Sequence, residues 1–189
     1  MADDGSPNIW DAWNFFDIQN RQLVAAYDML RVPVESGAGR HVVLVGLLVA
    51  LGSMNEGTNV ACRLNPRLET VRLRFEEHLR RWYRLRNDVA HVFERVFSPP
   101  RKGQNIPWIP GGLIVGSYNA ATDTVSTGAD PEASVVLHEA IEKAFELTTL
   151  LKLVNSDIRE ADYAEYSHPV PAQIEAIREE LAAEMRPCP

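Results

Sequence analysis

The chain has 189 residues, of which 46% are hydrophobic and 24% are charged. This length fits a single domain, and this composition excludes a largely disordered or collagen-like chain. A formal net charge of −7 predicts a protein with no overall attraction to nucleic acids or to anionic membranes.

Two helices are expected at the start of the chain. Ser6-Pro7 is typical of a helix start, because an N-cap residue is followed by proline, and apolar residues then recur at helical spacing to about residue 31. A second helix is expected at residues 39–55, which are apolar nearly all round and therefore suit the centre of a bundle. A turn is expected after it at residues 57–59, which read Gly-Thr-Asn.

The longest expected helix covers residues 66–97 and carries the basic charge of the chain. Asn65-Pro66 gives its start signal, and neither glycine nor proline interrupts it. Segment 63–102 contains eleven Lys and Arg residues against five acidic residues, whereas the rest of the chain contains eight against twenty-one. Ten of the eleven are arginine, which suits bidentate contact with phosphate or carboxylate. A plainer interpretation is that these arginines pair with acidic faces of the same protein or of a second subunit.

Residues 98–130 are rich in proline and glycine and are expected to form an insertion within a single domain, 1–189. Two short strands are expected in this region, at residues 113–118 and 122–127. Joined by a connection of hairpin size, they predict a β-hairpin over residues 112–127.

Two more helices are expected after the insertion. Asp130-Pro131-Glu132 combines a cap, a proline and an acidic first turn, and it predicts a helix that runs to about residue 156. A loop at 157–169 and a short helix that ends near residue 185 complete the chain. The expected fold class is mainly all-α: a bundle of about five helices with a β-hairpin insertion.

The chain shows no sign of export or membrane insertion. Cys62 and Cys188 are its two cysteines, too few for a disulfide framework, so a reducing compartment is expected. The acidic N-terminus does not resemble a signal peptide. The most apolar run, 42–51, is only about half of the roughly 20 residues that a membrane span needs. A cytoplasmic protein is therefore expected.

One group of residues on the basic helix suits catalysis. Residues 86–91 read Arg-Asn-Asp-Val-Ala-His. At helical spacing His91 lies on a stripe of arginines, with Asn87 one turn before it and Arg86 at the edge of the stripe. Histidine is the usual proton carrier near pH 7, and arginine supplies fixed positive charge. These two groups suffice to cleave RNA without metal, by attack of a 2′-hydroxyl on the adjacent phosphorus. The opposite side of this helix, expected to face the core, includes Trp82, Leu85 and Val89.

This segment resembles the signature of the HEPN superfamily, an arginine followed after four to six residues by a histidine, with a polar residue directly after the arginine. The resemblance implies a small helical bundle, often a homodimer that brings two motifs into one cleft, and a metal-independent endoribonuclease used as a toxin or in phage defence. It implies that Arg86 and His91 are catalytic and that Asn87 orients one of them. The hairpin is not part of the minimal family pattern.

Further residues on the same helix are candidates for contact with RNA. Two local ion pairs are expected, between Glu77 and Arg81 and between Arg84 and Asp88, which leaves Arg86 among the arginines most available to a ligand. Tyr83 is suited to stacking on a base, although a tyrosine in a dimer interface is the more favoured interpretation. The candidate RNA-binding residues are Arg80, Tyr83, Arg84 and Arg95.

Three functional hypotheses stay open from the sequence. The first is a homodimeric HEPN-type endoribonuclease, and the second is a catalytically silent helical module that binds nucleotide, RNA or protein. The third is the toxin of a toxin–antitoxin pair, with an antitoxin protein as partner. No cofactor and no metal site is expected, because His138-Glu139-x-x-Glu142 lacks the second histidine of a zinc-binding helix.

Overall fold

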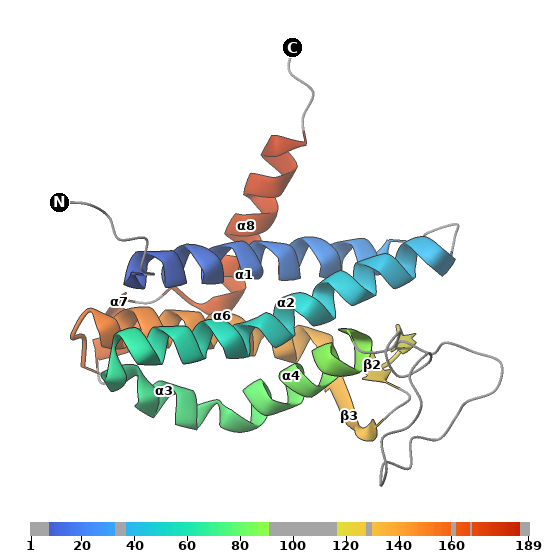
Figure 1. The fold of residues 1–189 in the computed structure, drawn as a ribbon. Coiled ribbons are helices and arrows are strands. Elements are labelled where there is room, and N and C mark those ends of the chain that lie inside the picture. Colours follow the sequence, from blue (N-terminus) through green and yellow to red (C-terminus); the bar gives the residue numbers. More distant parts are fainter. Residues whose placement is uncertain are drawn as a thin grey trace, which may run out of the picture.

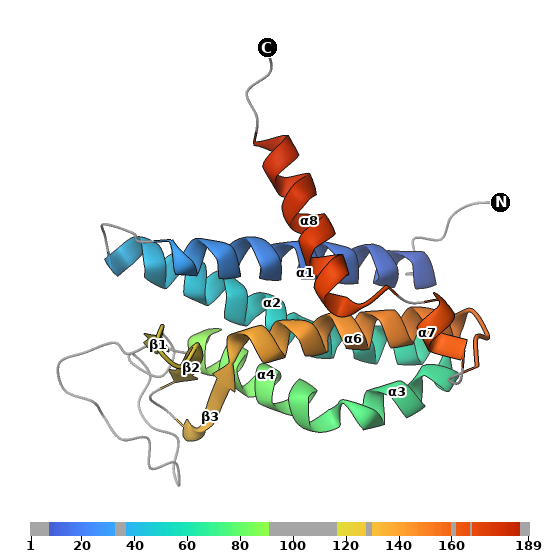
Figure 2. The same cartoon turned by 180° about the vertical axis from the view of Figure 1, so that it is seen from behind.

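The protein is a mainly helical bundle with a small antiparallel sheet at one end, as Figures 1 and 2 show. The structure is a computed structural model. Within the part of the chain that it describes, five helices have fifteen residues or more, which agrees with the expected fold class. The described residues are 8–32, 37–90, 117–127, 130–159, 162–166 and 168–185.

Helices α1 (Ile9–Arg31) and α2 (Gly37–Leu64) lie side by side as an antiparallel pair (Figure 1). α1 starts at Asn8, whose side-chain oxygen accepts hydrogen bonds from two backbone N–H groups, while Asp11 bonds back to the backbone of Asn8. This capping box replaces the expected start at Ser6-Pro7, a pair that lies outside the described residues.

The expected turn at residues 57–59 is wrong, because α2 continues through it to Leu64. Inside the helix, the Thr58 hydroxyl donates to the carbonyl of Met54 at 2.7 Å, so this buried side chain is satisfied locally. Gly57 is required by packing: a Cβ there would lie 2.6 Å from the Phe15 ring. The segment Gly39–Leu64 is long and apolar enough to cross a membrane by length and composition alone, and half of its most apolar window is buried in the bundle.

The long basic helix expected at 66–97 is divided into η1 (Pro66–Leu68), α3 (Glu69–Arg74) and α4 (Glu76–Ala90), while residues beyond 90 lie outside the description. Asn65 caps its start, as expected, by accepting the N–H of Arg67. The division falls at Phe75, a buried residue whose N–H is shared between two carbonyls at 3.2 Å each. The chain bends there and stays against the bundle (Figure 1). The expected core face of α4 is confirmed for Trp82, Leu85 and Val89, all buried.

The sheet consists of β1 (Ser117–Asn119), β2 (Thr124–Thr127) and β3 (Asp130–Val136), in the order β1-β2-β3. β1 and β2 form the expected hairpin, and residues 113–116 of the first expected strand lie outside the described residues. The helix start predicted at residue 130 is wrong, since residues 130–136 form β3. Val135 pairs with Val125 across the sheet and both are buried, so tertiary pairing overrides the local cap-and-proline signal.

Helix α6 (Leu137–Asn155) follows β3 directly and supplies much of the core. A short helix, α7 (Tyr163–Tyr166), lies in the segment expected to be a loop. The last helix, α8 (Val170–Glu184), crosses α1 and projects beyond the bundle (Figure 2). None of its residues is fully buried.

Candidate functional site

Arg86 lies one turn before the end of α4, on the side of that helix that contacts α2. Its Nη1 atom donates to Oε1 of Glu56 on α2 at 2.5 Å. The Arg86 side chain is 27% exposed, and that of Glu56 is 51% exposed. The sequence predicted that Arg86 is among the arginines most available to a ligand. In the structure its guanidinium is instead held by the carboxylate of Glu56, thirty residues earlier.

A glycine on α2 makes this arrangement possible. A Cβ on Gly52 would lie 2.3 Å from Cβ of Arg86, closer than real atoms approach. Gly52 and Glu56 are four residues apart, hence on one face of α2. One residue seats the aliphatic part of the Arg86 side chain and the other binds its charged end.

The remaining expected site residues are placed as follows. Asn87 is half-buried beside Arg86 on α4, and Tyr83 is 37% exposed. Arg80 and Arg84 are exposed on the same helix. The expected pair between Glu77 and Arg81 is confirmed, at 3.0 Å. His91 and Arg95 lie outside the described residues.

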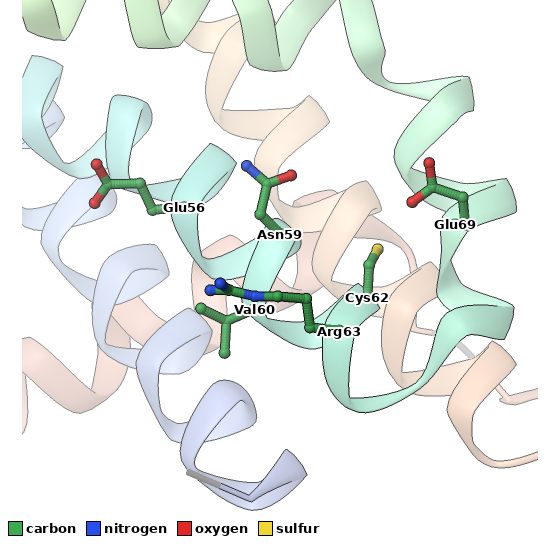
Figure 3. A pocket seen from close by; sticks show the side chains of 6 residues that line it. All are labelled: Glu56, Asn59, Val60, Cys62, Arg63 and Glu69. Atoms are coloured by element: carbon green, nitrogen blue, oxygen red, sulfur yellow. The ribbon is translucent and has the colours of Figure 1, made fainter. Parts of the chain in front are cut away.

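A hollow lies beside the Arg86–Glu56 pair, between α2 and the start of α3 (Figure 3). We call it the α2 hollow. Glu56 belongs both to the ion pair and to the wall of the hollow, so Arg86 stands at one end of this space. The lining residues are Glu56, Asn59, Val60, Cys62, Arg63 and Glu69.

The charges around the α2 hollow are partly compensated. Both carboxylate oxygens of Glu69 accept hydrogen bonds from Arg72 at 2.6–2.9 Å, and these bonds lower the pKa of Glu69 below its usual value. Burial, followed by the neighbouring Glu69 carboxylate, raises the pKa of the Cys62 thiol to about 11. The thiol therefore stays protonated near neutral pH and is unsuited to nucleophilic catalysis.

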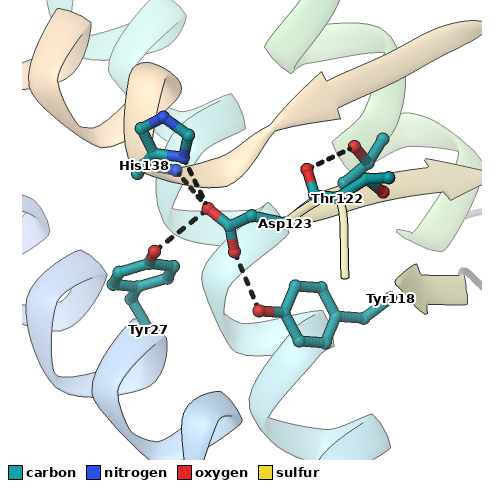
Figure 4. Close-up of polar contacts among 6 residues, drawn as sticks. Tyr27, Tyr118, Thr122, Asp123 and His138 are labelled. Atoms are coloured by element: carbon teal, nitrogen blue, oxygen red, sulfur yellow. Dashed lines mark hydrogen bonds and ion pairs between the residues drawn. The ribbon is translucent and has the colours of Figure 1, made fainter. Parts of the chain in front are cut away.

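A second polar cluster lies at the junction of α1, the sheet and α6 (Figure 4). We call it the Asp123 cluster: Tyr27, Tyr118, Asp123 and His138. The Asp123 carboxylate accepts the hydroxyl protons of Tyr27 at 3.0 Å and Tyr118 at 2.8 Å. It also accepts the backbone N–H of His138 at 3.0 Å, and Nδ1 of that ring lies 2.8 Å away.

Both oxygens of the Asp123 carboxylate are engaged by hydrogen bonds within the cluster. Burial raises the pKa of Asp123, but the hydrogen bonds from His138, Tyr118 and Tyr27 outweigh burial and hold the pKa below its usual value. Burial and the adjacent carboxylate raise the pKa of Tyr118 to about 12 and also raise that of Tyr27. Asp123 has φ = 50°, a backbone conformation tolerated best by Gly, Asn and Asp. The carboxylate acts as a remote cap for α6, whose own N-cap, Val136, provides no side-chain bond.

Among the described residues, no group of three or more His, Cys, Asp or Glu side chains is placed to hold a metal ion. His138 is committed to Asp123 at the start of α6, on the helix that superficially resembles a zinc-binding helix.

Sequence reasoning missed Glu56, Gly52 and Asp123. Glu56 carried one signal, an acidic residue in a helix that is otherwise apolar nearly all round. Asp123 carried none, because its partners come from segments up to 96 residues away. The chain matches no known family model, and neither the curated proteins nor the solved structures contain a significant match to it.

Proposed function

We propose that the chain is a HEPN-type, metal-independent endoribonuclease of the toxin or phage-defence kind. The observation that supports the proposal most is the state of Arg86. Its guanidinium is pre-oriented by Glu56 and partly exposed, next to Asn87 and five residues before His91. A fixed guanidinium at the surface is what stabilisation of a phosphorane-like transition state requires.

In the proposed reaction, His91 removes the proton from a ribose 2′-hydroxyl as its oxygen attacks the adjacent phosphorus. Arg86 binds the phosphate oxygens, on which negative charge increases, and Asn87 orients one of these groups. The P–O5′ bond breaks, which leaves a 2′,3′-cyclic phosphate and, after protonation, a 5′-hydroxyl. Arg80, Tyr83, Arg84 and Arg95 would contact the flanking RNA.

The proposal includes a second copy of the chain and a cytoplasmic location. A homodimer would bring two copies of the motif together, as the HEPN resemblance implies. Large apolar side chains on α2 are exposed, with Val42 at 70% and Val49 at 39%, and this surface is available to another chain. An antitoxin protein is the partner expected if the chain belongs to a toxin–antitoxin pair.

One observation favours the second candidate function, a catalytically silent helical module that binds nucleotide, RNA or protein. Arg86 already has an ion-pair partner in Glu56, and an arginine that only joins α4 to α2 would show the same contact. The two functions differ in whether removing the guanidinium abolishes chemistry or only weakens the bundle.

The full chain should be incubated with a mixed-sequence RNA in excess EDTA, and the products analysed for 2′,3′-cyclic phosphate ends. Cleavage by the wild type that is abolished in His91→Ala and Arg86→Ala, with circular dichroism and melting temperature retained, supports the nuclease. Arg81→Ala, on the same helix but paired with Glu77, and His168→Ala, an exposed histidine, are the matched controls. Equal cleavage by His91→Ala and the wild type would contradict it.

A further inference from the structure

We propose that the α2 hollow binds the nucleotide that flanks the scissile phosphate of an RNA substrate. This inference rests on the proposed function, because the hollow is placed relative to Arg86. Glu56 is shared between the Arg86 pair and the wall of the hollow. An RNA strand whose phosphate reaches Arg86 therefore has its neighbouring nucleotide beside this space.

The charge balance around the hollow favours a phosphodiester rather than a cation. Its two carboxylates, Glu56 and Glu69, are each bonded to an arginine, Arg86 and Arg72 respectively. Arg63 adds a third guanidinium, which is exposed and has no ion-pair partner among the described residues. Because both carboxylates are already paired, Arg63 is the lining cation whose charge is not compensated within the described residues, and its donors match phosphate oxygens.

The neutral side chains of the hollow suit a nucleobase. Asn59 is exposed and points between Glu56 and Glu69 (Figure 3). An asparagine amide both donates and accepts, and so can pair with the edge of an unstacked base. Val60 provides apolar surface for a ring face, and the Cys62 thiol stays neutral.

The order of these residues along α2 matches the order of groups in a nucleotide. Glu56, Asn59 and Arg63 lie on successive turns, and seven residues separate the first from the last. At 1.5 Å per residue this is roughly 10 Å. Arg86, which is bonded to Glu56, and Arg63, whose guanidinium lies beside Val60 (Figure 3), are thus placed to bind two consecutive phosphates, with the nucleoside against Asn59.

The test is binding of a trinucleotide made uncleavable by 2′-deoxy substitution at the cleavage position, measured by fluorescence anisotropy. Arg63→Gln is expected to weaken binding about tenfold, the effect of losing one charged hydrogen bond. Asn59→Ala is expected to reduce the difference in affinity between trinucleotides that differ only in the flanking base. Arg67→Gln, an exposed arginine paired with Asp157, is the matched control and should bind as the wild type does.

Equal binding by Arg63→Gln and Arg67→Gln would overturn the subsite, and so would equal effects of Arg63→Gln on a free mononucleotide and on the trinucleotide. The nuclease is tested separately, by loss of cleavage in His91→Ala. Cleavage that depends on His91, combined with unchanged binding in Arg63→Gln, refutes the subsite alone. Specific binding that depends on Arg63, without cleavage by the wild type, refutes the nuclease alone.

Discussion

Two regions of the molecule bring together charged and polar side chains from distant segments. One is the Arg86–Glu56 pair beside the α2 hollow, and the other is the Asp123 cluster. They differ in how many of their polar atoms have hydrogen-bond partners. Asp123 is 19% exposed and has donors from α1, β1 and α6 around its carboxylate. Glu56 is 51% exposed and has one bond to Arg86. The contrast separates polar groups that hold a fold together from polar groups that have capacity left for a ligand.

The two regions should therefore respond differently to substitution. Loss of a partly buried carboxylate that accepts several hydrogen bonds leaves those donors unsatisfied and lowers stability. Loss of a partly exposed ion pair has little effect on stability, since solvent screens it, and its effect should fall on function instead.

The largest expected effect is on catalysis. Arg86→Ala should lower kcat/KM for RNA cleavage by roughly 100- to 1,000-fold, the loss typical when one transition-state donor is removed. Arg86→Lys, which keeps the charge without the planar fork, should recover only part of the activity. Steady-state kinetics on a short RNA measure both, with urea unfolding in parallel. If Arg86→Ala loses activity only because the variant unfolds, the distinction between the Arg86–Glu56 pair and the Asp123 cluster would be contradicted.

The next effect is on stability, at the other region. Asp123→Asn should lower the free energy of unfolding by about 2–3 kcal/mol, because the hydroxyl and N–H donors around it lose a charged acceptor. Urea denaturation with a fitted midpoint measures this loss. Glu56→Gln is the paired variant, expected to cost less than about 1 kcal/mol. Equal losses in the two variants would contradict the distinction drawn here.

Two glycines of α2 provide a third comparison. Gly52→Ala should destabilise the protein by about 1–3 kcal/mol, because the added methyl collides with Arg86 and the packing has to shift. Gly46 faces open space, with nothing within 4 Å of an added Cβ. Gly46→Ala should therefore stabilise α2 by up to about 1 kcal/mol through helix propensity. Thermal unfolding of both variants measures the difference, and the same sign in both would disprove the close approach of α4 to Gly52.

The smallest effect concerns pH. The pKa of Asp123 is lower in the folded state than its usual value, so the unfolded chain binds more protons there and stability rises with pH across that interval. The contribution is complete above the unfolded pKa of about 4 and is lost as the pH falls through the folded pKa. Urea midpoints should therefore fall more steeply below pH 5 in the wild type than in Asp123→Asn. Parallel curves would show that this carboxylate is not the titrating group.

The sequence correctly predicted features that depend only on neighbouring residues, such as a helix cap and the buried face of a helix. The spacing of Trp82, Leu85 and Val89 is sufficient to identify the core face of α4, because one helix period determines which side is buried. The cap at Asn65 followed from two adjacent residues. These features need no knowledge of what packs against them.

The errors arose where a distant partner decides the outcome. Asp130-Pro131 has every local feature of a helix start, yet pairing of Val135 with Val125 extends a strand through it. Gly57 reads as a turn residue, but its function is to admit the Phe15 ring against a continuous helix. The Arg86–Glu56 bond joins residues thirty positions apart, so the sequence singles out Arg86 as a candidate residue but does not predict the carboxylate that orients it.

The attachment of α8 has a consequence for the behaviour of the molecule in solution. The apolar residues of the helix pack against the core, but none of them is fully buried. Arg178 binds Asp28 through two hydrogen bonds of 2.8 and 2.9 Å, and Arg21 binds Glu180 and Glu184. Added salt weakens such contacts far more than it weakens an apolar core. The C-terminal helix should therefore be the first segment to exchange its amide hydrogens as ionic strength rises, opening independently while the remaining helices stay protected.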